Sequence, residues 1–201
     1  MFSEWCYYSK AFTKDECEEI VRLGKSKELG EGVLGDGNHG GDSHVDLDYR
    51  RSNLRFIDEG EPGAGWIFDK MWKKALICNR EWFKLHLEQI ESFQFTEYKG
   101  NEEKPHRYKE HADVFWVTEN PYHRKLSAVL QLAESDAYQG GELRFSQLTT
   151  SNKYPTEQQE WEMRQQGSLI FFPSFVRHRV EPVTSGLRHS LVVWIDGPKW
   201  R

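Results

Sequence analysis

Residues 176–195 read VRHRVEPVTSGLRHSLVVWI, and this stretch decides the fold class. Two runs rich in β-branched residues, Val176 to Val183 and Arg188 to Ile195, are separated by a turn of Pro, Thr, Ser and Gly residues. The pattern predicts a strand, a turn and a returning strand, which would bring Arg188 back close to His178. The C-terminal part of the chain is therefore predicted to be β-structure.

Five more short runs with a period of two precede this stretch, all beyond residue 83. They are rich in β-branched and aromatic residues, and turn signals separate most of them: Ser92 to Tyr98, Ala112 to Val117, Leu126 to Ala133, Glu142 to Ser146 and Ser168 to Phe172. Strands at such short spacing are typical of a sandwich or barrel. The sequence predicts a mainly β fold, a jelly roll with helices packed on one face.

The first part of the chain has a different character. A capping box that begins at Thr13 predicts a helix N-terminus, and a helical apolar period predicts a second helix over Trp66 to Trp82. A short strand is predicted at Asn53 to Ile57. The segment Gly30 to Asp48 is rich in Gly, Asp, Asn and His, and we expect it to be a mobile loop that gates access together with the charged insert Lys99 to Glu110.

Length and hydropathy limit the class of protein. The chain has 201 residues, which favours one compact domain. Its longest apolar run is the five residues Leu191 to Ile195, whereas a membrane helix needs about 20, so no membrane span is expected. The N-terminus lacks the cationic and apolar segments of a secretory signal, which predicts a cytoplasmic protein.

Charge and cysteine content limit the partners. There are 27 Lys and Arg against 32 Asp and Glu, a net charge of −5, and the basic residues come in pairs such as Arg50-Arg51. This distribution argues against a nucleic-acid partner. The three cysteines have no C-x-x-C spacing, which is typical of a reducing compartment and disfavours a zinc site. A metal would have to be held by His and carboxylate side chains.

Three residues could form such a metal site. Residues two apart on a strand point to the same face, so His111 and Asp113 would lie side by side. His178, in a later strand, could supply a third ligand. Two His and one carboxylate on one side of a metal are typical of non-haem Fe(II) oxygenases. The alternative interpretation is a solvated His near an Asp, or a His hydrogen-bonded in the core.

Arg188 is a second unusual residue. It lies among apolar residues in a predicted strand, where a cation is costly to bury unless an anion pairs with it. A dicarboxylate whose other end chelates the metal would be such an anion, because the guanidinium fork matches a carboxylate. The alternative is a protein carboxylate such as Glu142.

From about Ser92 to Trp200 the chain resembles the 2-oxoglutarate and Fe(II)-dependent dioxygenases, specifically the prolyl 4-hydroxylase-like branch. The resemblance rests on linked elements in a fixed order: QFTEY at 94–98, HAD at 111–113, YQGGEL at 138–143, GSLIFFPS at 167–174, His178 and RHS at 188–190. It implies a double-stranded β-helix core over residues 91–201, with residues 1–90 as a helical and irregular support region.

The resemblance also implies the site. His111, Asp113 and His178 would bind iron, and no other catalytic residue is expected. Arg188, Ser190 and Tyr98 would hold the far carboxylate of 2-oxoglutarate. Tyr108 competes with Tyr98 for this contact, because the insert before His111 is longer than is usual in the family.

The activity implied is hydroxylation of an aliphatic C–H with release of succinate and CO₂, and a prolyl residue of a peptide or protein is the favoured substrate. O₂ would be consumed, and ascorbate is an expected reductant. Relatives of the peptidyl-proline type often have Lys where this chain has Arg188. A free amino acid or a nucleobase remains an alternative substrate. A jelly roll that binds a metal or another ligand without catalysis is the second class of function, since a fold alone does not fix a function.

Overall fold

The computed structural model describes residues 4–31, 46–146, 148 and 154–200. Most of the predicted loop Gly30 to Asp48 lies outside the described residues. The helical elements are α1 (Lys14–Lys25), α2 (Gly65–Cys78), the π-helical turn η2 (Asn79–Phe83) and α3 (Glu157–Arg164). The strands are β1 (Cys6–Tyr8), β2 (Gly30–Glu31), β3 (Arg50–Arg51), β4 (Asn53–Ile57), β5 (Gln89–Ile90), β6 (Phe93–Lys99), β7 (His106–His111), β8 (Tyr122–Gln131), β9 (Tyr138–Gly140), β10 (Leu143–Ser146), β11 (Leu169–Pro173) and β12 (Arg177–Pro198).

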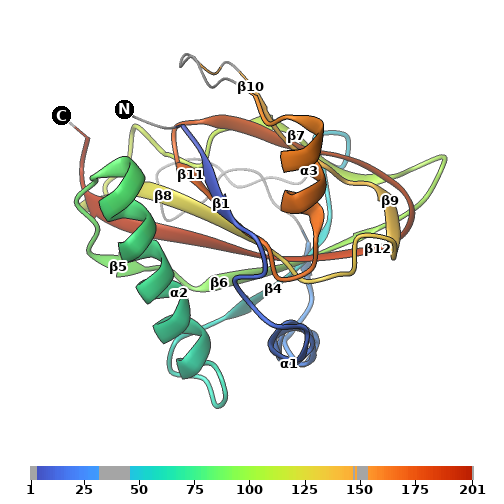
Figure 1. Cartoon of the computed structure of the whole chain (residues 1–201), viewed down its shortest axis with the longest axis horizontal. Coiled ribbons are helices and arrows are strands. Elements are labelled where there is room, and N and C mark those ends of the chain that lie inside the picture. The colour runs from blue at the N-terminus through green and yellow to red at the C-terminus, as the bar shows by residue number, and fades with distance from the viewer. Residues whose placement is uncertain (1–3, 32–45, 147, 149–153, 201) are drawn as a thin grey trace.

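Two antiparallel sheets share the long strand β12. The large sheet has the order β1-β11-β8-β12-β6-β4-β2, and β5 pairs with the end of β12. The small sheet has the order β3-β7-β12-β10, and β9 also pairs with β12. In Figure 1, β12 runs along the top, curves round at the right and returns along the bottom to the C-terminus. The predicted jelly roll is confirmed.

The predicted strand–turn–strand at 176–195 has an unexpected geometry. The chain does reverse, but its two halves do not pair with each other. His178 pairs with β7 and β10 in the small sheet, whereas Arg188 pairs with β6 in the large sheet. Gly186, at φ +75°, lies in the curve, where a Cβ would meet the Ala137 carbonyl oxygen at 2.0 Å. The two halves therefore face each other across the sandwich.

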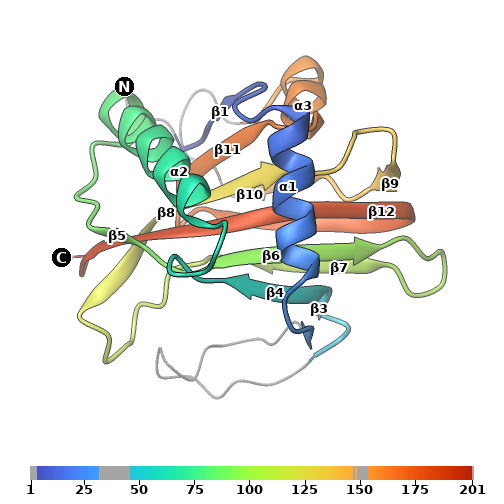
Figure 2. The same ribbon diagram turned by 90° about the horizontal axis from the view of Figure 1, so that it is seen from below.

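Two helices cover the outer face of the large sheet, as Figure 2 shows from below. The capping box of α1 is formed, with the Thr13 side chain accepting from the backbone N–H of Glu16 and Glu16 accepting from that of Thr13. The apolar side of α1 carries Cys17 and Ile20, and that of α2 carries Ile67 and other residues; these side chains join one core with the outward residues of the large sheet. The helices thus leave the opposite face of this sheet for the interior of the jelly roll.

One predicted strand is wrong. Residues Ala112 to Val117 form no strand, because the backbone N–H groups of Asp113 and Val114 both donate to the Ser174 carbonyl, at 2.9 and 3.1 Å, and the chain leaves the ladder. The strand lies just before, in β7. The segment Lys99 to Glu110, predicted to be a loop, therefore ends in a strand that delivers His111 to the interior.

Strands from the first part of the chain join both sheets. β1 pairs with β11 and β4 with β6 in the large sheet, while β3 pairs with β7 in the small sheet. A division of the chain near residue 90 stays a prediction. Among the described residues, no helix has the length and apolar character needed to cross a membrane.

The contact between α1 and the large sheet is testable at Gly24. A Cβ on Gly24 would lie 2.4 Å from Cγ of Phe95, so Gly24→Ala should destabilise the protein by about 1–3 kcal/mol in urea unfolding. Without this contact, Ala would stabilise the helix. The sign of the change in the free energy of unfolding therefore shows whether the contact exists. Gly60→Ala is the control, because nothing lies within 4 Å of its Cβ. A stabilised Gly24→Ala protein would contradict the close packing.

Candidate metal and co-substrate site

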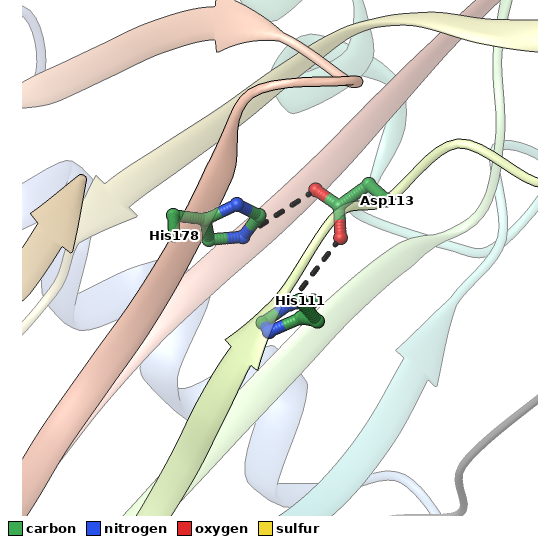
Figure 3. Close-up of side chains that lie close together, drawn as sticks. All are labelled: His111, Asp113 and His178. Atoms are coloured by element: carbon green, nitrogen blue, oxygen red, sulfur yellow. Dashed lines mark ion pairs between the residues drawn. The ribbon is translucent and has the colours of Figure 1, made fainter. Parts of the chain in front are cut away.

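Three side chains converge between the two sheets, and Figure 3 shows their ring and carboxylate atoms pointing toward one another. His111 is the last residue of β7, Asp113 follows two residues later, and His178 lies directly opposite His111 on β12. Nε2 of His111 lies 3.5 Å from Oδ1 of Asp113, and Nε2 of His178 lies 3.7 Å from Oδ2. One possible ligand atom from each residue lies within 4.8 Å of the others, so the three could hold one metal ion.

Hydrogen bonds orient the three side chains for this purpose. Nδ1 of His111 lies 2.8 Å from the Lys109 carbonyl oxygen, and Nδ1 of His178 lies 3.0 Å from that of Val176. A carbonyl only accepts, so each Nδ1 carries the proton and each Nε2 presents a lone pair. The Ser127 hydroxyl donates to Oδ2 of Asp113 at 2.7 Å. Partners of this kind fix the orientation of metal ligands.

The ionisation states suit a divalent cation. Burial, together with the neighbouring imidazole of His111, lowers the pKa of His178 to about 4 although Asp113 acts in the other direction, so His178 is neutral near pH 7. Burial alone would raise the pKa of Asp113, but the two imidazoles and the Ser127 hydroxyl hold it well below its usual range. The cluster therefore offers a neutral imidazole from His178 and a charged carboxylate from Asp113, beside the Nε2 of His111.

Arg188 lies in the same interior, on the large sheet. It is 1% exposed, its Nη2 donates to Oε1 of Gln131 at 3.0 Å, and its Nη1 lies 3.4 Å from Oγ of Ser190. Its Nε is buried without a hydrogen-bond partner. Tyr98 is its direct neighbour on β6, with the ring centroid 5.2 Å from Cζ. The structure thus brings the three residues expected at the far carboxylate, Tyr98, Arg188 and Ser190, together.

No protein carboxylate neutralises Arg188 within the described part of the chain. Glu142, the alternative partner, instead forms an ion pair with Arg164 at 3.1 Å. A buried cation without an anion is costly, so this position suits an anionic ligand.

Two tyrosines lie close to this interior, Tyr98 beside Arg188 and Tyr108 beside His111. Burial raises the pKa of Tyr98, with the charges of Arg188 and Asp113 acting on it in opposite directions. Tyr108 stacks on His111 with ring centroids 3.5 Å apart, and burial raises its pKa to about 12. Both phenols therefore line the interior, and the choice between them as a co-substrate contact stays open.

Two polar residues of this interior were not singled out by sequence reasoning. Ser127 and Gln131 lie on the same face of β8, four residues apart, where they meet Asp113 and Arg188. Both are buried polar residues in an otherwise apolar run, Leu126 to Leu132. That interruption is the signal that could have identified them.

Comparisons with known proteins agree with this geometry. The model of the 2OG-Fe(II) oxygenase superfamily, where 2OG is 2-oxoglutarate, matches residues 93–196. A PKHD-type hydroxylase of Synechococcus sp. (strain CC9311) is 30% identical over 183 residues, which cover 90% of this chain and 72% of the relative. A PKHD-type hydroxylase of Shewanella sp. (strain ANA-3) is 35% identical over 104 residues, 51% of this chain and 41% of the relative.

Solved structures share the fold. A prolyl-4-hydroxylase of Pseudomonas putida superposes with a TM-score of 0.67 at 23% identity, covering 96% of this chain and 91% of the other. A prolyl hydroxylase of Trichoplax adhaerens, in complex with a peptide fragment of hypoxia inducible factor, superposes with a TM-score of 0.68 at 16% identity. The match covers 96% of this chain and 83% of the other. The matched family model spans the strands that carry all three clustered ligands and Arg188, and this chain belongs to the 2OG-Fe(II) oxygenase superfamily.

Proposed function

We propose that the protein is an Fe(II)- and 2-oxoglutarate-dependent dioxygenase that hydroxylates an aliphatic C–H, with a prolyl residue of a peptide or protein as the favoured substrate. His111, Asp113 and His178 bind the iron. The observation that carries the proposal is the pairing of this cluster with a buried Arg188 that has no carboxylate partner among the described residues. A jelly roll that only binds a metal has no use for that cation.

The cluster fits Fe(II) chemically. Two imidazoles and one carboxylate on one side of an ion leave the other coordination positions open, as non-haem Fe(II) oxygenases require. The described residues place no fourth His, Cys, Asp or Glu ligand in the cluster. Ser127 holds the carboxylate, and the backbone carbonyls hold the rings, so the donor atoms are oriented by the protein itself.

Arg188 and its neighbours fit one end of 2-oxoglutarate. The guanidinium can give a carboxylate two parallel hydrogen bonds, and the buried Nε is an unused donor. Ser190 and Tyr98 offer hydroxyl groups beside it, and Gln131 keeps the guanidinium in place. These residues bind and orient the diacid and exclude water from it.

When bound, Fe(II) and 2-oxoglutarate supply the oxidising chemistry, in which O₂ converts 2-oxoglutarate to succinate and CO₂ while the substrate gains a hydroxyl group. The chain contributes position and a dry interior. Asp113, Tyr98 and Arg188 are each at most 6% exposed, so the interior that surrounds the reaction is largely closed to solvent. Ascorbate would serve as the external reductant that maintains the ferrous state.

The substrate class rests on the relatives. The structures with the same fold include a prolyl-4-hydroxylase and a prolyl hydroxylase in complex with a peptide fragment. The curated relatives are named hydroxylases. These names support a peptidyl substrate for this chain, and a free amino acid is the alternative that the substrate experiment below separates.

The iron ligands are tested by turnover of 2-oxoglutarate. Wild-type protein with Fe(II), O₂ and ascorbate should form succinate, and His111→Ala should lose at least about 100-fold in rate, because an outer-shell change alone already costs about 10–100-fold. His86→Ala is the control, since the His86 side chain is 73% exposed and outside the cluster. Equal succinate formation by wild type and His111→Ala would contradict the assignment.

Arg188 separates an oxygenase from a metal-binding module. Removing one partner of a buried charge pair costs about 2–5 kcal/mol, so Arg188→Ala should raise the dissociation constant for 2-oxoglutarate by at least about 30-fold. Fe(II) affinity should not change. Arg188→Lys keeps the positive charge but lacks the forked guanidinium group. Its dissociation constant for 2-oxoglutarate should therefore lie between those of wild type and Arg188→Ala. Calorimetry on folded variants measures both constants, and unchanged 2-oxoglutarate affinity in Arg188→Ala would favour the non-catalytic module.

The substrate class is tested by product mass. Proline-containing peptides incubated with the enzyme, Fe(II) and 2-oxoglutarate should gain the mass of one oxygen atom on the prolyl residue, as located by fragmentation. Free proline and free nucleobases are run in parallel. Oxidation of free proline at a rate equal to that of the peptide would overturn the peptidyl assignment.

A further inference from the structure

The outer face of the small sheet carries a group of cations that the active site does not use. Inward neighbours on the same strands, such as Arg50, Tyr108, His178 and Leu143, point into the interior, so the residues next to them point outward. The outward residues define what we call the arginine face: Arg51, Arg107, Lys109, Arg144, Arg177 and Arg179.

Two like-charged pairs lie directly opposite each other in the ladders of this face. Arg51 on β3 is in register with Arg107 on β7, and Arg144 on β10 is in register with Arg179 on β12. Like charges directly opposite across antiparallel strands destabilise a sheet. A like-charged pair that no carboxylate compensates therefore keeps positive charge on the surface at a cost in stability.

The compensation of these charges is uneven. Arg144 pairs with Glu160, Arg177 with Glu110 at 2.8 Å, and Arg179 with Glu181 at 2.7 Å. By contrast, no carboxylate of the described residues forms an ion pair with the other three cations, Arg51, Arg107 and Lys109. Arg107 donates only to a neutral acceptor, the Asp48 carbonyl oxygen, at 2.9 Å. The uncompensated charge thus gathers on β3 and β7.

The positive charge also affects the pKa of a nearby histidine. His106, at the start of β7, has its pKa lowered first by burial and then by the charges of Arg51 and Lys99, although contacts with Glu97 act in the other direction. The positive character therefore extends along the edge of the small sheet, on a protein whose net charge is −5.

We propose that the arginine face binds an acidic segment of the protein substrate, and the inference rests on the proposed function. The face lies on the strands that carry two of the possible iron ligands, since Arg177 and Arg179 flank His178 on β12, and Arg107 and Lys109 lie on β7, which ends at His111. In this proposal, a polypeptide substrate extends from the site past the edge of the small sheet and reaches the face there. The guanidinium group of an Arg side chain can donate two parallel hydrogen bonds to one carboxylate.

A nucleic-acid backbone fits the face less well. The carboxylates of Glu110, Glu160 and Glu181 pair with three arginines of the face and would repel a continuous line of phosphates. A peptide with acidic side chains at alternate positions can avoid these carboxylates and reach the uncompensated cations of β3 and β7. The acidic peptide is therefore the occupant to which the proposal commits.

The test uses the full chain without iron or 2-oxoglutarate, and a fluorescein-labelled peptide of alternating Glu and Ser. Wild-type protein should bind this peptide in fluorescence polarisation, should not bind the same peptide with Gln in place of Glu, and should lose affinity as salt rises. Arg51→Gln should weaken binding by about tenfold, which corresponds to about 1.4 kcal/mol. Arg80→Gln, which removes an exposed arginine of η2, should bind like wild type.

Thermal unfolding distinguishes binding from a structural role. Arg51→Gln removes a repulsive pair, and the Arg51 side chain forms no hydrogen bond with the residues that the structure describes, so the melting temperature of the variant should rise by about 1–3 °C. If Arg51 stabilised the fold, its replacement by Gln would lower the melting temperature. A lowered melting temperature, equal binding of the Glu and Gln peptides, or tighter binding of an oligothymidylate than of the Glu peptide would each overturn the proposal.

Turnover connects the face to the proposed function. A proline peptide with an acidic tail should have a lower KM than the same peptide with a serine tail, at equal kcat, and Arg51→Gln should remove the difference. Equal KM values for the two peptides would overturn the link to the substrate. If neither peptide is oxidised while the acidic peptide still binds, the proposed function fails and the binding by the face stands.

Discussion

The whole site depends on one strand that belongs to two sheets. The first half of β12 is hydrogen-bonded into the small sheet and carries His178, and its second half is hydrogen-bonded into the large sheet and carries Arg188. Because both ladders are fixed by backbone hydrogen bonds, the separation of these two side chains is set by the curve of the chain near Gly186. A short diacid that joins the two positions therefore meets a spacing that the backbone determines.

Burying charge is the cost of this arrangement. Asp113 is held ionised between two imidazoles, and Arg188 is enclosed without a carboxylate partner among the described residues. Replacing such groups with apolar side chains is often neutral or stabilising in other proteins. The proposed ligands, a metal ion at the cluster and an anion at Arg188, would account for their presence here. The same reasoning applies on the surface, where Arg51 and Arg107 face each other.

Much of the fold and the candidate site could be predicted from local patterns. Alternation located most strands, and the spacing of His111 and Asp113 predicted neighbours that the structure does bring together with His178. The strand β7 was missed because its outward residues are all charged, which hides the alternation of His106 and Tyr108. Ser127 and Gln131 acquire their partners only through contacts between distant segments. The arginine face was equally hidden, since its members come from four strands far apart in the sequence.

The two histidine rings of the cluster are held by the same local device, a hydrogen bond from Nδ1 to the carbonyl oxygen two residues earlier in the chain. Each restraint involves only backbone two residues away in the chain and no metal. Much of the entropy of ordering these ligands is thus lost during folding rather than during metal capture. Chelation should therefore leave a folded apoprotein that takes up a fresh ion without refolding, unlike small domains that depend on zinc to fold.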